Sequence, residues 1–457
     1  MKITLVNPNQ LNPFRKHPAS KRSLVFRDIG PPPTLASLLG SLGYDHDVKL
    51  IDHFLEYQHL GPDDVEVDLE AAARREFPDS DVIGISTMTN SRKASLDFVR
   101  LAREISNARV IVGGPHATTM ARQLLEHYPI DAAVLREAEI TFPELIRAIE
   151  TGGDLRQVEG IAIRPEGEFL LTKPRQVVTD LDDLPTPDYN PYFELDHAHE
   201  IKTISTMTSR GCPHRCKFCS NYWGKRVRTK SVGKVVQELT GFADLGVKTV
   251  RVEDDTLTLN SAHAKKLFRE IGAAGLGLEL HAITRFGTLD DEMAELYVRA
   301  GGKSFDSAIE TGSASLRGKM GKALTNRQIY GGAEILKRAG IDMYLYVMLG
   351  FPGETERDLE ATMSMLERLQ PAGLTCSIFH PYPELRQYEE LRRQGLVSDE
   401  DFLDEDKTKL HVLEGEELEL RRRYRREILK GFGLTKRPDY EGMLSDGVSS
   451  YTEVAEG

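Results

Sequence analysis

The stretch that decides the fold is Gly211-Cys212-Pro213-His214-Arg215-Cys216-Lys217-Phe218-Cys219, which holds three of the chain's four cysteines. It directly follows a run of alternating apolar residues, 201–207, which predicts a strand. Thiolates in this C-x3-C-x2-C spacing must surround one inorganic centre. Three thiolates favour a [4Fe–4S] cluster with one open iron, because four cysteines normally complete such a site. Zinc is the alternative, but a structural zinc ion takes four ligands, and His214 between the thiolates is badly placed to be the fourth.

The spacing, with the aromatic residue Phe218 before the third cysteine, resembles the radical SAM superfamily. The resemblance implies that Cys212, Cys216 and Cys219 hold the cluster, whose open iron binds the amino and carboxylate groups of S-adenosylmethionine (SAM). One electron from the cluster would then cleave SAM into methionine and a 5′-deoxyadenosyl radical. Phe218 is implied to lie near the adenine.

The composition excludes several other classes of protein. With 457 residues the chain is long enough for two or more domains. Its net charge of −12 argues against nucleic acid as a partner, since a large phosphate-binding surface needs basic residues. No apolar run approaches membrane-spanning length, and Met1-Lys2-Ile3-Thr4 predicts a strand rather than a signal peptide. Four cysteines, three of them clustered, make no disulfide framework, so we expect the reducing cytoplasm.

Basic residues surround the cysteine motif. They form either a solvated loop or a surface that meets an anionic substrate or an electron donor. The resemblance implies an external one-electron donor of the flavodoxin or ferredoxin type. The residues are Arg215, Lys217, Lys225, Arg226, Arg228 and Lys230.

Residues 1–150 alternate short β-rich runs with amphipathic segments of helical length. Strict alternation predicts an α/β domain with a doubly wound parallel sheet, whose ligands bind at the carboxyl ends of the strands. No G-x-G-x-x-G follows the first strand, so a nicotinamide or flavin site lacks its phosphate loop. Strands are predicted at 3–6, 48–52, 82–87, 109–112 and 132–135, and helices at 34–42, 69–75, 93–105, 118–127 and 142–150.

The loops at those strand ends resemble the cobalamin-binding domain that precedes many radical SAM cores. The last loop departs from the family's Gly-Glu-Gly-Glu turn, because Arg136 and Ala138 replace both glycines. No D-x-H-x-x-G motif is present, so cobalt is expected to lack a histidine ligand, and loop 87–90 is the candidate to face its lower side. For Met88, Asn90 and His116 singly, ordinary loop packing or local hydrogen bonding is the alternative. The cobalamin contacts implied are Asn7, Ser86, Thr87, Met88, Thr89, Asn90, Gly113, Gly114, Pro115, His116, Glu137 and Glu139.

A linker, 151–200, with a predicted hairpin at 161–163 and 169–172, leads to a second α/β region. From 201 to 380, six strand–helix units match the partial (β/α)6 barrel of radical SAM enzymes, in which chemistry gathers at the carboxyl ends of the strands. Residues 381–457 form a C-terminal helical tail, with a helix at 414–429 that is either solvated or a substrate lid, and a poorly ordered end. The barrel strands are predicted at 203–208, 248–253, 278–283, 304–309, 342–348 and 374–379.

Two of these strand ends carry charged groups that suit the amino-acid part of SAM. By resemblance, Asp254 or Asp255 accepts hydrogen bonds from the ammonium group, with helix capping as the alternative. Arg285 is placed to grip the carboxylate with its planar fork, and a surface salt bridge is the alternative.

Two further strand ends resemble the nucleoside-binding motifs of the family. Glu310, with Gly312 and Ser313, is implied to bind the ribose hydroxyls, although the motif's leading glycine is an alanine here. Gly350 and Glu354 belong to a Gly-x-Pro-Gly-Glu-Thr loop with a structural role and an adenine contact. The candidate for a catalytic side chain is Cys376, which is either a small buried hydrophobe or a thiol that reaches the active-site cavity.

These features predict a cobalamin-dependent radical SAM C-methyltransferase that methylates an inert carbon of a small secondary metabolite or lipid-like molecule. A cyclase or rearrangement enzyme without methyl transfer is the alternative. A methylthiotransferase is disfavoured because residues 1–211 contain no cysteines for a second cluster. A non-catalytic cobalamin-binding or iron–sulfur sensor has no need of Glu310 or of the glycine-rich loop.

Overall fold

The structure is a computed structural model, which describes residues 1–8, 31–52, 69–194, 201–403 and 412–432. The chain divides into two compact units, Met1–Thr206 with Asp244–Val247, and Met207–Ala243 with Lys248–Gly457. The C-terminal end that was expected to be poorly ordered lies outside the described residues. In the part of the chain that is described, no helix is both long and apolar enough to cross a membrane.

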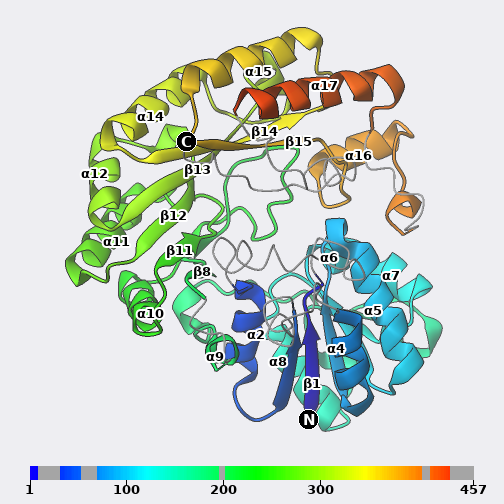
Figure 1. Cartoon of the computed structure of the whole chain (residues 1–457). Helices are drawn as coiled ribbons and strands as arrows, with labels where there is room; N and C mark the ends of the chain where they lie inside the picture. Colours follow the sequence, from blue (N-terminus) through cyan, green and yellow to red (C-terminus); the bar gives the residue numbers. More distant parts are fainter. Residues whose placement is uncertain (9–30, 53–68, 195–200, 404–411, 433–457) are drawn as a thin grey trace, which may run out of the picture. The chain divides into compact units, whose positions relative to one another are not determined.

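The first unit is built on a sheet with the strand order β2-β1-β3-β4-β5-β6-β7 (Figure 1). The strands β1 to β5 are parallel, and the hairpin strands β6 and β7 continue the sheet in antiparallel fashion. The order reverses direction between β1 and β3, the position at which open α/β sheets bind their ligands. The predicted doubly wound sheet is confirmed. The strands are β1 (Lys2–Val6), β2 (Asp47–Ile51), β3 (Val82–Ser86), β4 (Arg109–Gly113), β5 (Ala132–Val134), β6 (Ile161–Ile163) and β7 (Leu170–Leu171).

Helices cover both faces of this sheet. The helices α2 (Pro33–Leu42) and α8 (Thr141–Glu150) bury Leu35 and Phe142 against Ile3 and other strand residues in the main apolar core. Figure 1 shows α4 (Leu69–Glu76) and α5 (Arg92–Ile105) on the opposite side of the sheet. Burial on both faces explains why the strands are nearly continuous apolar runs.

The helix predicted at 118–127 is two helices in the structure. They are α6 (Pro115–Thr119) and α7 (Ala121–His127), and Met120 between them leaves the helical conformation, with φ −109° and ψ 22°. Pro115 starts α6 earlier than the apolar periodicity suggested, because proline is favoured in the first helical turn. The break follows α6, the short helix that carries His116.

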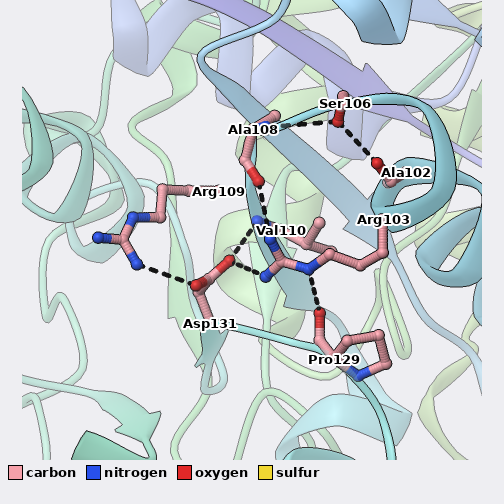
Figure 2. A network of polar contacts seen from close by, with 8 residues as sticks. All are labelled: Ala102, Arg103, Ser106, Ala108, Arg109, Val110, Pro129 and Asp131. Atoms are coloured by element: carbon pink, nitrogen blue, oxygen red, sulfur yellow. Dashed lines mark hydrogen bonds and ion pairs between the residues drawn. The ribbon is translucent and has the colours of Figure 1, made fainter.

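A network around Asp131 ties the amino-terminal ends of β4 and β5 to the end of α5 (Figure 2). The Asp131 carboxylate accepts hydrogen bonds from Val110 N at 2.7 Å and from Arg109 Nη1 at 3.0 Å, and it pairs with Arg103. Arg103 also donates to the carbonyl oxygen of Pro129 at 2.8 Å. This charged network lies at the end of the sheet opposite to the expected ligand loops, so it is structural.

A second parallel sheet has the order β15-β14-β13-β12-β11-β8, and its strands from β11 to β15 belong to the second unit (Figure 1). Strand and helix alternate along the chain as the sequence predicted, and the arc of strands is an open barrel. A short ribbon, β9 (Ser209–Arg210) with β10 (Arg228–Thr229), brackets the cysteine loop. The parallel strands are β8 (Thr203–Thr206), β11 (Thr249–Val252), β12 (Glu279–Thr284), β13 (Gly302–Glu310), β14 (Asp342–Leu349) and β15 (Gly373–Ile378).

The two faces of this second sheet differ in polarity. On the face under the helices, Tyr297 stacks on Phe305 with ring centroids 4.0 Å apart. The other, inner face carries Arg251 and Asp306. Alternation along β15 puts Cys376 on the helix-covered face, beside its register partner Val347. The covering helices are α10 (Val232–Asp244), α11 (Ser261–Ala274), α12 (Asp291–Arg299), α13 (Ala314–Lys319), α14 (Asn326–Ala339) and α15 (Glu356–Leu369).

The tail helix α17 (Gly415–Gly431) is packed, so the interpretation of a solvated tail helix is wrong. It buries Arg421, Tyr424 and Ile428. Its Arg425 donates a hydrogen bond to the carbonyl oxygen of Cys376 at 2.7 Å. The arginines that suggested a solvated surface therefore include the residues that attach the helix to the barrel.

Candidate active site

The cysteine loop is fixed at both arms by backbone contacts. Gly211 has a φ of 97°, and a Cβ there would lie 2.2 Å from the carbonyl oxygen of Arg226, so only glycine fits. The next residue, Cys212, donates its N–H to Gly224 O at 3.0 Å. On the other arm, Lys217 N donates to Met320 O at 2.9 Å. The loop conformation is therefore set before any metal binds.

The thiols of the loop lie close enough for their charges to influence one another. The residue Cys219 is exposed as a whole, yet the surroundings of its sulfur raise the thiol pKa to about 11, chiefly through burial and then through Asp255, Cys216 and Cys212. Burial also raises the pKa of Cys212. Cys212 and Cys219, whose raised pKa values favour the neutral thiols, suit a cluster, because bound iron is what converts such thiols to thiolates. Within the described ranges, no three His, Cys, Asp or Glu side chains are close enough to hold a single metal ion.

The two adjacent aspartates after β11 have different surroundings. Asp254 is fully buried and accepts four hydrogen bonds, from Thr208 N, Thr208 Oγ1, Ser209 N and Ser209 Oγ, at 2.6 to 2.9 Å. It caps no helix; it fixes the entry to the cysteine loop. Asp255 is half-buried and accepts one bond, from Gly211 N at 3.1 Å. Asp255 is therefore the aspartate with acceptor capacity left for a ligand.

Charged side chains from separate strand ends meet near the thiols. Arg285, after β12, faces Cys216, Cys212 and Glu310: burial lowers its pKa, and these groups raise it. Glu310, at the end of β13, has a left-handed backbone with a φ of 63° and forms a buried ion pair with Lys322 at 2.9 Å. The Lys322 ammonium also lies 5.6 Å from the centre of the Phe218 ring. The structure thus brings the predicted Phe218, Arg285 and Glu310 together with the cysteines.

The glycine and serine after Glu310 have structural contacts. A Cβ on Gly312 would lie 2.1 Å from the carbonyl oxygen of Ala361 in α15, so glycine permits close helix packing. Ser313 caps α13, since its hydroxyl accepts a hydrogen bond from Leu316 N at 3.3 Å. Helix packing and helix capping therefore explain why Gly312 and Ser313 follow Glu310, whichever ligand binds beside them.

The loop after β14 is completed by the tail. Glu354 Oε2 accepts hydrogen bonds from Gly350 N at 2.7 Å and from Arg421 Nε of α17 at 3.2 Å. Its Oε1 is buried and has no hydrogen-bond partner among the described residues. Burial raises the pKa of Glu354 to about 7, although the N–H of Gly350 and the charge of Arg421 oppose the shift. Glu354 is therefore held by the sequence's last described helix.

We expect Glu354 to make the second unit less stable as the pH rises from 5 to 8. Its folded pKa of about 7 exceeds the ordinary 4.5, so the folded state binds the proton more tightly, and that stabilisation is lost as the pH passes 7. The wild-type chain should lose about 3 kcal/mol of unfolding free energy over this range. Urea titration followed by Trp223 fluorescence measures it. Glu354→Gln should flatten the dependence and exposed Glu356→Gln should not; equal slopes in all three proteins would contradict the assignment.

The inner face of the barrel holds a polar network that sequence motifs did not indicate. The Tyr346 hydroxyl donates to Asp306 at 2.8 Å, and Arg251 lies 3.4 Å from the same carboxylate. Arg251 also pairs with Glu253 at 3.3 Å. On the neighbouring strands, His281 Nδ1 lies 2.6 Å from Ser304 Oγ. The barrel interior of the second unit therefore offers hydrogen-bonding groups rather than an apolar lining.

In the first unit, Thr87 joins the two central ligand loops. Its N–H donates to Gly113 O at 2.7 Å, and its hydroxyl accepts from Ala117 N at 3.0 Å. Gly114 has a φ of 105°, and a Cβ there would lie 2.6 Å from Thr87 O, so the two loops touch through their backbones. Thr87 and Thr89 are buried supports, whereas Met88 and Asn90 are exposed. Loop 87–90 thus exposes Met88 and Asn90 to solvent.

His116, in α6 next to this loop pair, is fully buried. Its Nδ1 lies 3.1 Å from Thr89 Oγ1, and its Nε2 finds no hydrogen-bond partner among the described residues. Burial, and then the charge of Arg92, lower its pKa to about 3. His116 is therefore neutral at ordinary pH, with one ring nitrogen available.

We expect His116 to weaken the first unit in acid. Its folded pKa of about 3 lies below the ordinary 6.5, so below pH 6.5 the unfolded chain takes up a proton that the folded chain refuses. Lowering the pH from 6.5 to 5 should cost about 2 kcal/mol of stability. Hydrogen exchange at the β3 and β4 amides, corrected for intrinsic rates, measures this. His116→Gln should remove the loss and exposed His127→Gln should keep it; a loss unchanged in His116→Gln would refute it.

The turn after β5 keeps a tight shape without its glycines. Arg136 takes the left-handed conformation, with a φ of 61°, and its N–H donates to Thr118 Oγ1 at 2.8 Å. A non-glycine residue in this conformation costs about 1 kcal/mol. Glu137 and Glu139 that follow are half-buried, and Asn7 at the end of β1 is half-buried as well.

Sequence reasoning missed Lys322 and Arg421. Lys322 lies in the short connection between α13 and α14, and Arg421 lies in an arginine-rich helix, so neither is part of a motif. Both are buried cations that neutralise predicted carboxylates. A buried carboxylate requires such a partner, which only the tertiary structure reveals.

Comparison with known families matches both units. Residues 206–366 match the model of the Radical SAM superfamily, and residues 24–146 match the B12 binding domain. The protein named "Uncharacterized methyltransferase PH0819" from Pyrococcus horikoshii is 31% identical over 396 residues, covering 85% of this chain and 83% of its own. Cytidylyl-2-hydroxyethylphosphonate methyltransferase of Streptomyces wedmorensis is 26% identical, covering 81% of this chain and 78% of its own.

A solved structure shares the fold. The radical SAM methyltransferase TsrM from Kitasatospora setae, determined with tryptophan and a SAM analogue, superposes with a TM-score of 0.69 at 20% identity and covers 86% of this chain and 76% of its own. The cofactors of the matched families are a [4Fe–4S] cluster, SAM and cobalamin. With the cysteine loop, the barrel and the doubly wound sheet all in place, the chain belongs to the family of radical SAM enzymes that carry an N-terminal cobalamin-binding domain.

Proposed function

We propose that the chain is a methyltransferase that adds a methyl group to an unactivated carbon of a small molecule, using a radical and cobalamin. One observation carries the proposal: Arg285, Glu310 and Lys322 lie close to the cysteine loop in the second unit. The first unit of the same chain matches the B12 binding domain. The cofactors of this family supply the radical chemistry and the methyl carrier. The protein supplies binding, orientation and exclusion of water.

In this proposal each charged residue contacts one part of SAM. Asp255 accepts hydrogen bonds from the ammonium group, and Arg285 binds the carboxylate, because a guanidinium matches a carboxylate bidentately. Glu310 accepts hydrogen bonds from the ribose hydroxyls, and its buried ion pair with Lys322 holds the carboxylate in place. Phe218 packs against the adenine. In the first unit, the exposed Met88 and Asn90 face cobalamin, and the cobalt receives no histidine from a D-x-H-x-x-G motif.

The chemistry of the barrel interior supports a polar group in the substrate. Arg251, Asp306 and Tyr346 form a network on the inner face, and such groups are costly to bury unless a ligand or a neighbour satisfies them. We therefore propose a small metabolite with hydrogen-bonding groups near the carbon that is methylated. The electron that starts the reaction comes from an external one-electron donor, and the enzyme acts in the cytoplasm.

The test of this function needs no substrate. Purified chain is reconstituted anaerobically with iron, sulfide and hydroxocobalamin, desalted, and incubated with SAM and dithionite. A methyltransferase of this type should release both 5′-deoxyadenosine and S-adenosylhomocysteine, the second because methylation of cobalamin consumes SAM. Release of 5′-deoxyadenosine alone would favour the cyclase or rearrangement alternative. Release of neither would contradict an enzymatic role and leave a cofactor-binding module.

A further inference from the structure

The inner face of the second sheet is less buried than the face under the helices. Along β11, β12, β14 and β15, buried residues alternate with partly exposed ones. The partly exposed set includes Arg251, His281, Tyr346 and Ser377, which share the inner face because side chains alternate along a strand. In a barrel whose interior is filled by its own side chains, both faces would be buried. The inner face of this sheet is therefore accessible to a ligand.

Asp306, on β13, is a deeply buried carboxylate of this inner face, with 3% of its surface exposed. Its Oδ2 accepts a hydrogen bond from the Tyr346 hydroxyl at 2.8 Å and lies 3.4 Å from Arg251 Nη2. Its Oδ1 accepts no hydrogen bond from the residues that the structure describes. Leaving a buried carboxylate oxygen without a donor is costly, and a donor group on a ligand would remove that cost.

The charged groups beside Asp306 leave an excess of negative charge. Arg251 lies 3.4 Å from Asp306 and 3.3 Å from Glu253, so one guanidinium is shared by two carboxylates. His281, on the neighbouring strand β12, adds no positive charge, because burial and then the charge of Arg251 lower its pKa to about 4. The surroundings of Asp306 therefore favour a positively charged ligand over a neutral or negatively charged one.

Aromatic rings are a second feature of this face that suits a cation. Tyr344 is the register partner of Asp306 on β14, and Tyr346 follows two residues later on the same face. The negative face of an aromatic ring attracts an ammonium group. A neutral hydroxyl group would gain only the hydrogen bond to Oδ1 of Asp306.

We propose that Asp306 binds a basic amino group of the substrate, which enters the open barrel as an ammonium ion. Asp306 then determines specificity for amine-bearing metabolites, while Tyr346 and Arg251 hold its carboxylate in place. The amino group positions the carbon that is methylated, and no bond to its nitrogen is made or broken. The inference rests on the proposed function, because it names the substrate class of the same barrel.

The test uses n-butylammonium, n-butanol and butyrate, three probes of similar size that differ in charge. Their dissociation constants for the cluster-loaded, full-length chain with SAM are measured by ligand-observed NMR at constant ionic strength. The wild type should bind butylammonium at least about tenfold more tightly than butanol, and butyrate more weakly than either. Asp306→Asn should raise the dissociation constant for butylammonium at least about tenfold and change that for butanol less than about twofold.

Three further variants control for a loss of structure. Asp342→Asn, the same substitution at an exposed residue of β14, should bind all probes as the wild type does. Tyr346→Phe keeps the carboxylate of Asp306 and should bind butylammonium at least as tightly as the wild type. If Asp306→Asn does not fold, Glu253→Gln, which removes a half-buried charge beside it, should raise the dissociation constant for butylammonium at least about threefold.

Each outcome bears on one of the two proposals. Equal affinities of the wild type for butylammonium and butanol, or no detectable binding of butylammonium, would overturn the assignment of an ammonium group. An unchanged affinity in folded Asp306→Asn, or in Glu253→Gln where Asp306→Asn does not fold, would overturn the site. Release of 5′-deoxyadenosine with dithionite is measured on the same protein without probes. If the wild type releases none, the proposed function fails, whereas the titration still decides the amine site.

Discussion

Replacing Cys212, Cys216 or Cys219 by Ala, one at a time, should abolish both cluster loading and 5′-deoxyadenosine formation, whereas Cys376→Ala should leave both unchanged. Each of the first three thiols belongs to one loop, and removing one of three ligands leaves the iron without a closed site. Cys376→Ala is the matched control because it removes the same thiol group from β15, outside the cysteine loop. Burial raises its pKa to about 12, so it stays a neutral thiol.

The measurement is bound iron per chain, the charge-transfer absorption of the cluster, and 5′-deoxyadenosine after incubation with SAM and dithionite. Cys376 lies on the helix-covered face of β15, so its replacement leaves only a small cavity that costs about 1 kcal/mol. Methylation that persists in all three loop variants would refute the radical assignment. Loss of activity in Cys376→Ala with full iron content would return that thiol to the list of catalytic candidates.

The second large effect should separate the two adjacent aspartates. Asp254→Asn should destabilise the second unit by about 3–5 kcal/mol and prevent cluster loading, because the amide group turns a hydrogen-bond donor toward donors in a fully buried position. Asp255→Asn should load iron normally and raise the KM for SAM at least about tenfold, through the loss of a charge-assisted contact. The iron content should therefore change only in Asp254→Asn, and the KM for SAM of the cluster-loaded protein should change in Asp255→Asn.

The control for this pair is the wild-type chain measured at the same cluster occupancy. If Asp255→Asn loses iron as Asp254→Asn does, then Asp255 is a support of the loop and not a SAM contact. If Asp254→Asn loads iron and keeps its stability, the four hydrogen bonds to Thr208 and Ser209 do not determine the loop. Either result would change which aspartate is assigned to the ammonium group.

The parallel strands of both units were predictable from sequence, because those of the first unit are short apolar runs bounded by turns and several of those in the second sheet alternate buried with less buried residues. The strand β14 was expected at 342–348 and spans Asp342–Leu349. The ends of helices were predictable only where apolar residues recur at helical spacing without interruption. The break at Met120 has no composition signal, since methionine favours helices and Pro115 had seemed part of a loop.

The ion-pair partners of the site were not predictable. The cysteines and Glu310 belong to motifs, whereas Lys322 and Arg421 are single basic residues. Lys322 lies 12 positions from its partner Glu310, and Arg421 lies 67 positions from its partner Glu354. The solvated interpretation of the tail failed for the same reason. An arginine-rich helix has no visible apolar face in sequence, yet Arg421 reaches a buried carboxylate with its aliphatic stem covered by the barrel.

The contact between Arg421 and Glu354 also orders events during synthesis. A ribosome releases the last barrel strand, β15, well before it releases α17, so for an interval the nascent barrel contains Glu354 without its counter-charge. In that interval the loop after β14 lacks the two hydrogen bonds that Arg421 donates to Glu354 in the complete fold. The loop after β14 therefore reaches its final arrangement only once α17 has emerged and Arg421 can contact Glu354.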